Sequence, residues 1–158
     1  MMSKILVVED SPVVLKVLKH LLSKSSHLSP VLCASYGEAQ AAYEEQGGAD
    51  FFAAIVDLNL PDAQNGEIVD LVLSWGIPCV VLTGTYDDQL RLDLLNKGVL
   101  DYIAKDSRYS FNHAISVIER LKKNQSITAL VAEDSSTSRL FITALLEQYR
   151  FNVISVEN

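Results

Sequence analysis

Short runs of apolar, mostly β-branched residues alternate along the chain with longer stretches in which apolar residues recur every three or four positions. Such short runs are typical of buried strands, and the longer stretches are typical of amphipathic helices. We expect strands over residues 4–8, 31–35, 52–57, 79–83 and 101–105. We expect helices near residues 12–25, 36–46, 65–75, 87–97 and 108–122. The pattern therefore predicts regular alternation of strand and helix over the first 124 residues.

Residues at the ends of the predicted helices support these boundaries. Ser11 before Pro12 is typical of a helix N-cap followed by proline at the first helical position. Ser35 with Glu38 three positions later fits a capping box. Glycines stand where helix C-termini favour a left-handed residue, at Gly47, Gly48, Gly76 and Gly98.

Strands separated by helices imply crossover connections, so we predict an α/β fold with a parallel, doubly wound sheet covered by helices on both faces. The continuous apolar run over residues 52–56 agrees, because strands buried on both sides do not alternate. In open sheets of this kind, ligands bind at the carboxyl ends of the strands. The residues that follow the strands are therefore the candidate functional residues.

Three acids, one hydroxyl and one cation stand at those strand ends, namely Glu9, Asp10, Asp57, Thr83 and Lys105. Two carboxylates about 5 Å apart repel each other by about 3 kcal/mol at an effective dielectric of 20, so such a group needs a proton or a cation. Oxygen ligands with room for water suit Mg²⁺. With a metal there, Asp57 is a credible nucleophile for covalent phosphoryl transfer, and Lys105 and Thr83 would meet phosphoryl oxygens.

Residues 3–124 resemble the response-regulator receiver domain, the phosphoacceptor module of two-component signalling. The resemblance rests on the acid pair Glu9-Asp10, on Asp57 with Pro61 and Gly66 after it, on the run ending in Thr83-Gly84, and on the stretch from Lys97 to Lys105. It implies a flavodoxin-like fold whose five parallel strands lie in the order 2-1-3-4-5.

The resemblance also implies the roles of the strand-end residues. Asp57 would accept a phosphoryl group from a sensor histidine kinase or a histidine phosphotransfer protein. Mg²⁺ would be held by Glu9, Asp10, Asp57 and the backbone carbonyl of Asn59. Such a domain would catalyse its own phosphorylation and dephosphorylation without being a conventional enzyme.

A two-state switch is implied as well. Lys105 would pair with the phosphoryl group, Thr83 would move towards it, and Tyr102 would turn inward into the vacated space. The surface expected to change, residues 84–122, is the family's usual dimerisation or output face.

The chain departs from the receiver pattern at Asp106, where receivers usually have a proline after the lysine, often through a cis peptide. A cis bond before a non-proline residue costs about 2.5–4 kcal/mol, so we expect a trans peptide between Lys105 and Asp106. The Asp106 carboxylate also adds negative charge near the site, which we expect to slow phosphorylation.

Three alternatives use the same fold or chemistry. A phosphatase resembling the haloacid-dehalogenase group needs a second aspartate two positions after the nucleophile, where this chain has Asn59. A nucleotide- or flavin-binding domain wants a glycine- or hydroxyl-rich loop after the first strand, where Glu9 and Asp10 would repel a phosphate. A pseudo-receiver that only docks partners, without phosphorylation, would be expected to lack some of the acids, the threonine or the lysine.

The opening of the chain recurs near its end. Residues 5–22 and 129–146 align at an offset of 124, with Glu133-Asp134-Ser135 on Glu9-Asp10-Ser11. We interpret residues 125–158 as the truncated start of a second receiver, with one strand, one helix and a second strand over 151–156. Alone it is too small to be a domain and has no counterpart of Asp57. We therefore expect a longer tandem protein, whose output module is often a diguanylate cyclase, and association through this segment or through the 84–122 face.

Composition narrows the expected partners and location. The chain is 49% hydrophobic and 21% charged, with a net charge of −7 and its acids spread along its length, so we expect no nucleic-acid partner. It has no apolar run of the ~18 to 20 residues that span a bilayer and no signal-peptide region at its N-terminus, so we expect no membrane insertion and a cytoplasmic location. Cys33 and Cys79 lie in apolar strand-like runs without metal-ligand spacing, and we expect two buried free thiols. In the implied strand order, ~14 Å separates their strands, too far for a disulfide.

Overall fold

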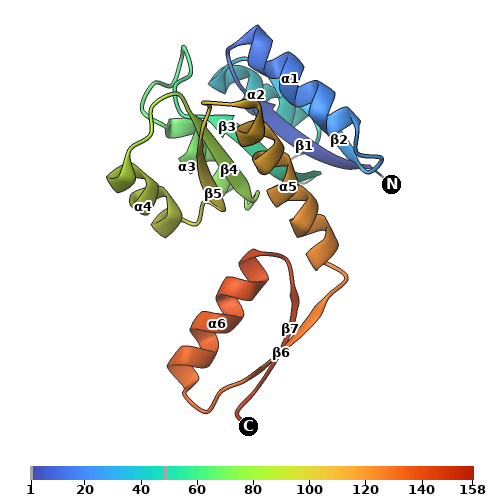
Figure 1. Cartoon of the computed structure of the whole chain (residues 1–158), viewed down its shortest axis with the longest axis vertical. Helices are drawn as coiled ribbons and strands as arrows, with labels where there is room; N and C mark the ends of the chain where they lie inside the picture. Colours follow the sequence, from blue (N-terminus) through green and yellow to red (C-terminus); the bar gives the residue numbers. More distant parts are fainter. Residues whose placement is uncertain (1, 48–49) are drawn as a thin grey trace. The chain divides into compact units, whose positions relative to one another are not determined.

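A computed structural model describes residues 2–47 and 50–158 (Figure 1). The strands are β1 (Ser3–Val8), β2 (Leu28–Cys33), β3 (Phe51–Asp57), β4 (Cys79–Thr83), β5 (Asp101–Ala104), β6 (Thr128–Ala132) and β7 (Asn152–Val156). The helices are α1 (Pro12–Ser23), α2 (Tyr36–Glu45), α3 (Glu67–Ser74), α4 (Asp88–Lys97), α5 (Arg108–Asn124) and α6 (Ser136–Gln148). By their internal contacts the residues form two compact units, Met1–Ile115 and Ser116–Asn158.

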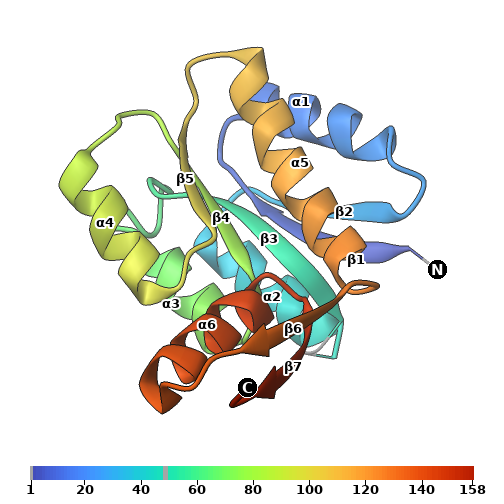
Figure 2. The ribbon, with the colours of Figure 1, turned by 60° about the horizontal axis from the view of Figure 1, so that its bottom comes forward.

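The first unit contains a five-stranded parallel sheet in the order β2-β1-β3-β4-β5, with helices on both faces (Figure 2). This confirms the predicted doubly wound, flavodoxin-like fold. Its central strands are buried on both faces, because helices cover each of them: Ile5, Leu6, Val7 and Val8 of β1 are all fully buried. The core on one face joins the sheet to α2, α3 and α4, through Ala39, Ile68, Val69, Val72 and Leu94.

Of the five predicted strands, β2 differs most from its prediction. It spans Leu28–Cys33 rather than 31–35, so Pro30 does not lie before the strand. Pro30 instead pairs with Ile5 inside the strand. A proline cannot donate to a neighbouring strand, but β2 is an edge strand and needs hydrogen bonds on one side only.

The predicted helix ends all lie within two residues of the observed ones. Ser11 caps α1, where its hydroxyl accepts from the amide of Val14, and Ser35 caps α2 in the same way from Glu38. Three of the four predicted glycines, Gly47, Gly76 and Gly98, have a positive φ, and Gly48 lies outside the described residues. Helix α3 begins at Glu67, two residues later than predicted, because Gly66 at its N-cap is left-handed.

Two aromatic rings stack where α2 and α3 end. The rings of Tyr43 and Trp75 are parallel within 3°, with centroids 3.8 Å apart. Trp75 caps the C-terminus of α3, just before β4 begins, so the stacked pair lies towards the amino ends of the strands.

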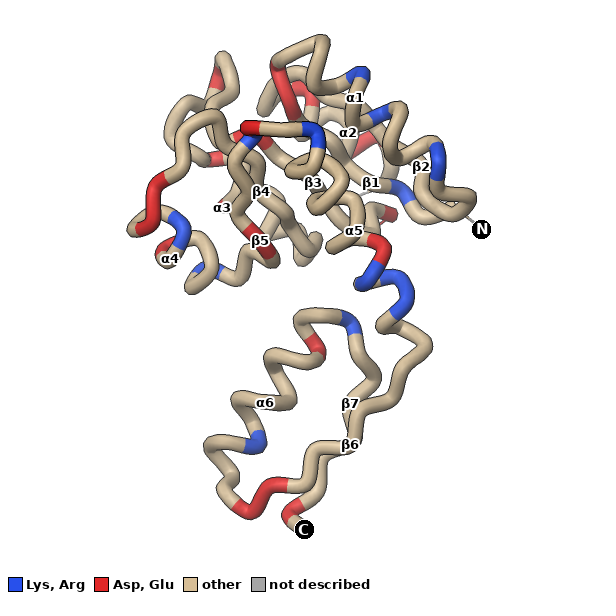
Figure 3. Tube along the Cα trace, viewed as in Figure 1, with Lys and Arg blue, Asp and Glu red and all other residues tan. Residues whose placement is uncertain are grey.

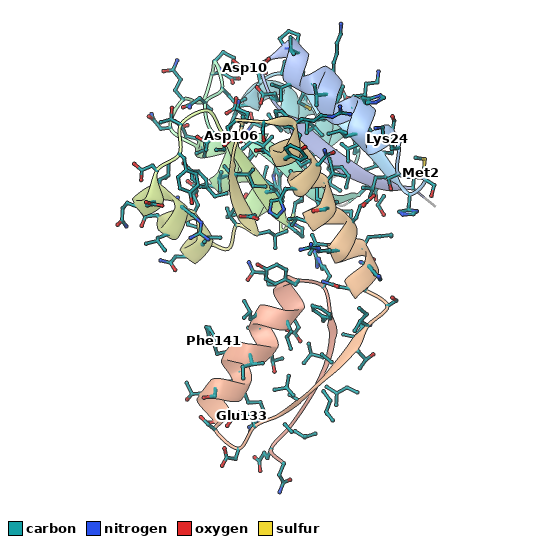
Figure 4. The ribbon with its side chains drawn as sticks, in the orientation of Figure 1. Met2, Asp10, Lys24, Asp106, Glu133 and Phe141 are labelled. Atoms are coloured by element: carbon teal, nitrogen blue, oxygen red, sulfur yellow. The ribbon has the colours of Figure 1, made fainter. Side chains whose placement is uncertain are left out.

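The second unit contains a βαβ arrangement. Strands β6 and β7 pair in parallel and are joined by α6. Many of its large apolar side chains are exposed, among them Leu130 at 68%, Leu140 at 71% and Phe141 at 70% (Figure 4). Leu6, which corresponds to Leu130 at the offset of 124, is fully buried in the first unit. The second unit therefore lacks the cover that the matching segment of the first unit has.

Other expectations from composition can be compared with the described residues. Cys33 and Cys79 are both buried and free, as predicted. Acidic and basic residues of both units are interspersed along the trace (Figure 3). None of the described helices has the combined length and apolar character that a bilayer crossing requires.

Candidate functional site

The register of the parallel strands places the predicted site residues at one edge of the sheet. Val8, the last residue of β1, lies opposite Val56, so Glu9 comes out beside Asp57. On the other side of β3, Asp57 lies opposite Leu82, so Thr83 follows on β4. Thr83 in turn lies opposite Ala104, and the amide of Lys105 donates to the carbonyl of Thr83 at 2.7 Å. Glu9, Asp57, Thr83 and Lys105 therefore lie together at the carboxyl ends of β1, β3, β4 and β5.

Lys105 joins two of the acids. Its Nζ lies 3.0 Å from Oδ2 of Asp57 and 3.0 Å from Oε2 of Glu9. Both carboxylates are nearly inaccessible to solvent, with Glu9 1% and Asp57 3% exposed. Their other oxygens accept from backbone amides, Oε1 of Glu9 from Ser11 at 3.0 Å and Oδ1 of Asp57 from Asn59 at 3.1 Å. The two buried carboxylates are therefore fixed in orientation by hydrogen bonds at both oxygens.

The charges at this edge are not balanced by protein groups alone. Burial raises the pKa of Glu9 to about 7, against the opposing effect of the Ser11 amide, and the neighbouring carboxylate of Asp57 raises it further. Burial alone would lower the pKa of Lys105, but its hydrogen bonds to Asp57 and Glu9 outweigh this and hold that pKa above its ordinary value. One ammonium group thus faces three acids, since Asp10 lies beside them.

The arrangement fits a divalent cation with oxygen ligands. One carboxylate oxygen from each of Glu9, Asp10 and Asp57 lies within 4.8 Å of the others. Asp10 is exposed and lines a cavity of about 420 Å³ together with Asn59, so there is room for an ion that keeps several waters. Hard oxygen donors, surplus negative charge and access for water are the conditions that Mg²⁺ prefers.

The two predicted switch residues meet at the loop after β4. The Thr83 hydroxyl donates to the carbonyl of Thr85 at 2.7 Å. The Tyr102 hydroxyl donates to the same carbonyl at 3.2 Å and accepts from the amide of Asp87 at 3.2 Å. Tyr102 is 3% exposed, so in this structure its ring already lies inside. Thr85 takes part here through its backbone carbonyl, a contact that no residue type in the sequence could indicate.

The carboxylate of Asp106 accepts a hydrogen bond from the first turn of α5. As predicted, the peptide before it is trans, as are all peptide bonds of the described chain. Its carboxylate accepts from the hydroxyl of Ser110 at 2.6 Å, and hydrogen bonds from Ser110 and Ser107 hold its pKa below the ordinary value. The extra negative charge is therefore engaged by the start of α5 (Figure 4).

Sequence reasoning also missed the amides of the loop after β3. Gln64 and Asn65 line the cavity beside Asp10, and they also line a second cavity of about 420 Å³ that includes Thr83. The only signal in the sequence is that two carboxamides stand directly before Gly66. Their distance from Asp57 along the chain gives no reason to expect them at the site.

Several solved structures are similar to this chain in fold and in sequence. Two solved structures titled two-component system response regulator/GGDEF domain protein are each 35% identical to the chain, with TM-scores of 0.86 and 0.85. In each case the match covers 99% of this chain and 62% of the other, so this chain spans less than two thirds of those proteins. The chemotaxis response regulator CheY4 of Vibrio cholerae, 22% identical over 75% of this chain and 99% of its own, shares the fold with a TM-score of 0.62.

Comparisons of the sequence with known proteins point to the same family as the residues of the site. A curated relative, the hybrid signal transduction histidine kinase D of Dictyostelium discoideum, is 26% identical over 154 residues, which are 91% of this chain but 9% of that protein. Residues 5–115 match the family described as the response regulator receiver domain. They include every acid, the hydroxyl and the lysine at the sheet edge described above. The chain belongs to the response regulator receiver domains of two-component signalling.

Proposed function

We propose that Asp57 is the phosphoryl acceptor of this receiver domain, in a reaction that depends on Mg²⁺. The observation that carries the proposal is the position of Lys105, whose ammonium group lies 3.0 Å from both Asp57 and Glu9. Asp57 is thus a buried carboxylate with its orientation fixed, next to one cation and two further acids. Receiver domains of this family are generally Mg²⁺-dependent and act with histidine kinases or phosphotransfer proteins.

The proposed reaction transfers the phosphoryl group from a phosphohistidine to Asp57. A carboxylate oxygen of Asp57 forms the new bond to phosphorus as the bond from phosphorus to the histidine nitrogen breaks, and the donor leaves as a histidine. Glu9, Asp10, Asp57 and the carbonyl of Asn59 would hold Mg²⁺, which neutralises charge on the phosphoryl oxygens. Lys105 exchanges its bond to Glu9 for one to a phosphoryl oxygen.

Thr83 then couples the acceptor to the rest of the domain. To meet a phosphoryl oxygen, its hydroxyl must leave the carbonyl of Thr85, which it contacts at 2.7 Å. The hydroxyl of Tyr102 still donates to the Thr85 carbonyl. It also accepts from the amide of Asp87, the residue that caps the N-terminus of α4. The proposed switch therefore passes from Thr83 to the start of α4, within the 84–122 face expected to carry output or dimerisation.

Incubation with acetyl phosphate and Mg²⁺ tests the proposal. We expect the intact protein to gain the mass of one phosphoryl group, and we expect EDTA or Asp57→Asn to prevent the gain. The measurement is intact-mass spectrometry at neutral pH. Labelling that persists in Asp57→Asn would reject Asp57 as the acceptor. An unlabelled wild-type chain that keeps its fold would favour the alternative, a docking module that works without phosphorylation.

We further propose that residues 125–158 are the start of a second receiver. Support comes from the sequence repeat and from matching geometry, because Glu133 accepts from the amide of Ser135 at 3.0 Å as Glu9 does from Ser11. The GGDEF domain named in two relatives supports the expected diguanylate cyclase output in a longer protein. We keep two further predictions. One is a homodimer through this segment or through the 84–122 face, and the other is a cytoplasmic location.

A further inference from the structure

Two hollows flank the acceptor site and share one wall. The first is lined by Asp10, on the metal side of the site, and the second by Thr83, on the hydroxyl side. Three residues line both hollows, Asn59, Gln64 and Asn65, and each carries a carboxamide. Asn59 also bonds the acceptor, since its backbone amide donates to Oδ1 of Asp57 at 3.1 Å, so the shared wall begins beside Asp57.

The loop that carries this wall is firmly held. The carboxylate of Asp62 accepts from the amides of Tyr36 and Gly37, each at 2.9 Å, and so ties the loop to the start of α2. Leu60 and Ala63 exchange two backbone hydrogen bonds, at 3.1 and 3.2 Å. Gln64 lies directly after this closed turn, and beyond it the amide of Gly66 donates to the carbonyl of Leu58 at 3.2 Å, so the backbone is held on both sides of Gln64 and Asn65.

The side chains of Gln64 and Asn65 are available for a ligand. Both are exposed, and within the described chain neither carboxamide is engaged in a hydrogen bond with another residue. A carboxamide offers both a donor and an acceptor without charge. It can therefore hold a water molecule beside a phosphoryl group, where a carboxylate would be repelled by the phosphoryl oxygens.

We propose that the Gln64–Asn65 pair positions the water that hydrolyses the aspartyl phosphate, and so sets the lifetime of the phosphorylated state. This inference rests on the proposed function. The water oxygen forms a bond to phosphorus as the bond from phosphorus to Asp57 breaks. Asp57 returns to a carboxylate, inorganic phosphate leaves, and the proton of the water passes to the phosphate or to solvent. The amides are positioning residues, since they touch the water and not the phosphorus.

The test is the half-life of the labelled protein after the phosphodonor is removed by rapid desalting into Mg²⁺ buffer. One hydrogen bond to the attacking water is a modest interaction, so we expect Gln64→Ala with Asn65→Ala to lengthen the half-life about three- to tenfold. Gln64→Met keeps the length of the side chain but removes its polar atoms, and should also lengthen the half-life. The initial rate of labelling is measured separately for each variant, so that an effect on hydrolysis is distinguished from one on phosphoryl transfer.

Gln89→Ala is the matched control, because Gln89 is an exposed glutamine on α4 that bonds Asp93 and lines neither hollow. It should leave the half-life as in the wild type. A half-life that stays the same in the double variant would overturn the inference, and one that shortens would show that the amides shield the phosphoryl group from water. Failure of the wild-type chain to take any label would overturn the proposed function, and the inference with it.

Discussion

Glu9 shows what a single buried acid does to this fold before a metal binds. Its pKa is about 7 in the folded chain and 4.5 as an ordinary glutamate. Below pH 4.5 both states hold the proton and Glu9 makes no difference. Between pH 4.5 and 7 the unfolded chain loses the proton while the folded chain keeps it, so stability falls as the pH rises. Above pH 7 the full penalty applies.

We predict that Glu9→Gln removes this loss. In the presence of EDTA, the free energy of unfolding of the wild type should fall relative to that of Glu9→Gln by up to about 3 kcal/mol between pH 5 and pH 8. Urea denaturation at a series of pH values measures both curves. Parallel curves for the two proteins would show that Glu9 is ionised without a penalty.

The residues at the sheet edge also show which parts of the site could be predicted from the sequence. Asp57, Thr83 and Lys105 were predicted to meet because parallel strands end at one edge, and backbone register brings them there. The sequence did not reveal that Lys105 bonds Glu9 as well as Asp57, because the choice of partner depends on side-chain reach. Nor did it reveal Gln64, because the path of a loop follows from contacts such as those of Asp62, distant along the chain.

Among the elements, the loop between β3 and α3 depends most on one backbone conformation. Gly66 has φ of +75° at the N-cap of α3, and its amide donates to the carbonyl of Leu58 at 3.2 Å. A Cβ atom there would lie 3.1 Å from Cδ2 of Leu58. Both the conformation and the available space favour glycine.

We therefore predict that Gly66→Ala lowers the free energy of unfolding by about 1–2 kcal/mol, since a left-handed conformation costs that much for other residues. Chemical denaturation measures the effect. Gly84→Ala is the control, because Gly84 has no positive φ and nothing lies within 4 Å of its added Cβ. Equal stability of the two variants would mean that the loop relaxes at no cost.

At the scale of the whole molecule, the second unit is the part whose apolar surface is least covered. Strand β6 pairs with β7 on one side only, and it carries neither a charge nor a proline that would protect its other edge. Leu130 and Phe141 are exposed at 68% and 70%. Exposed strand edges and apolar patches of this kind favour association with another chain.

We predict that the 158-residue chain self-associates as its concentration rises, and that Leu130→Lys with Phe141→Lys weakens this association. Light scattering coupled to size-exclusion chromatography over a range of concentrations measures it. Val13→Lys, at a side chain of α1 that is 70% exposed in the first unit, is the control. A wild-type chain that stays monomeric at every concentration would contradict the prediction.

The stacked pair of Tyr43 and Trp75 gives the first unit an internal optical marker. Trp75 is the single tryptophan of the chain, and it lies before β4, whereas Thr83 and the acids lie where the strands end. Its emission and the near-ultraviolet dichroism of the pair therefore follow the packing of α2 on α3, at the pole remote from the phosphoryl chemistry. Unfolding should therefore change this signal while phosphorylation leaves it nearly unchanged, so the pair reports whether a phosphorylated sample is still folded without any added label.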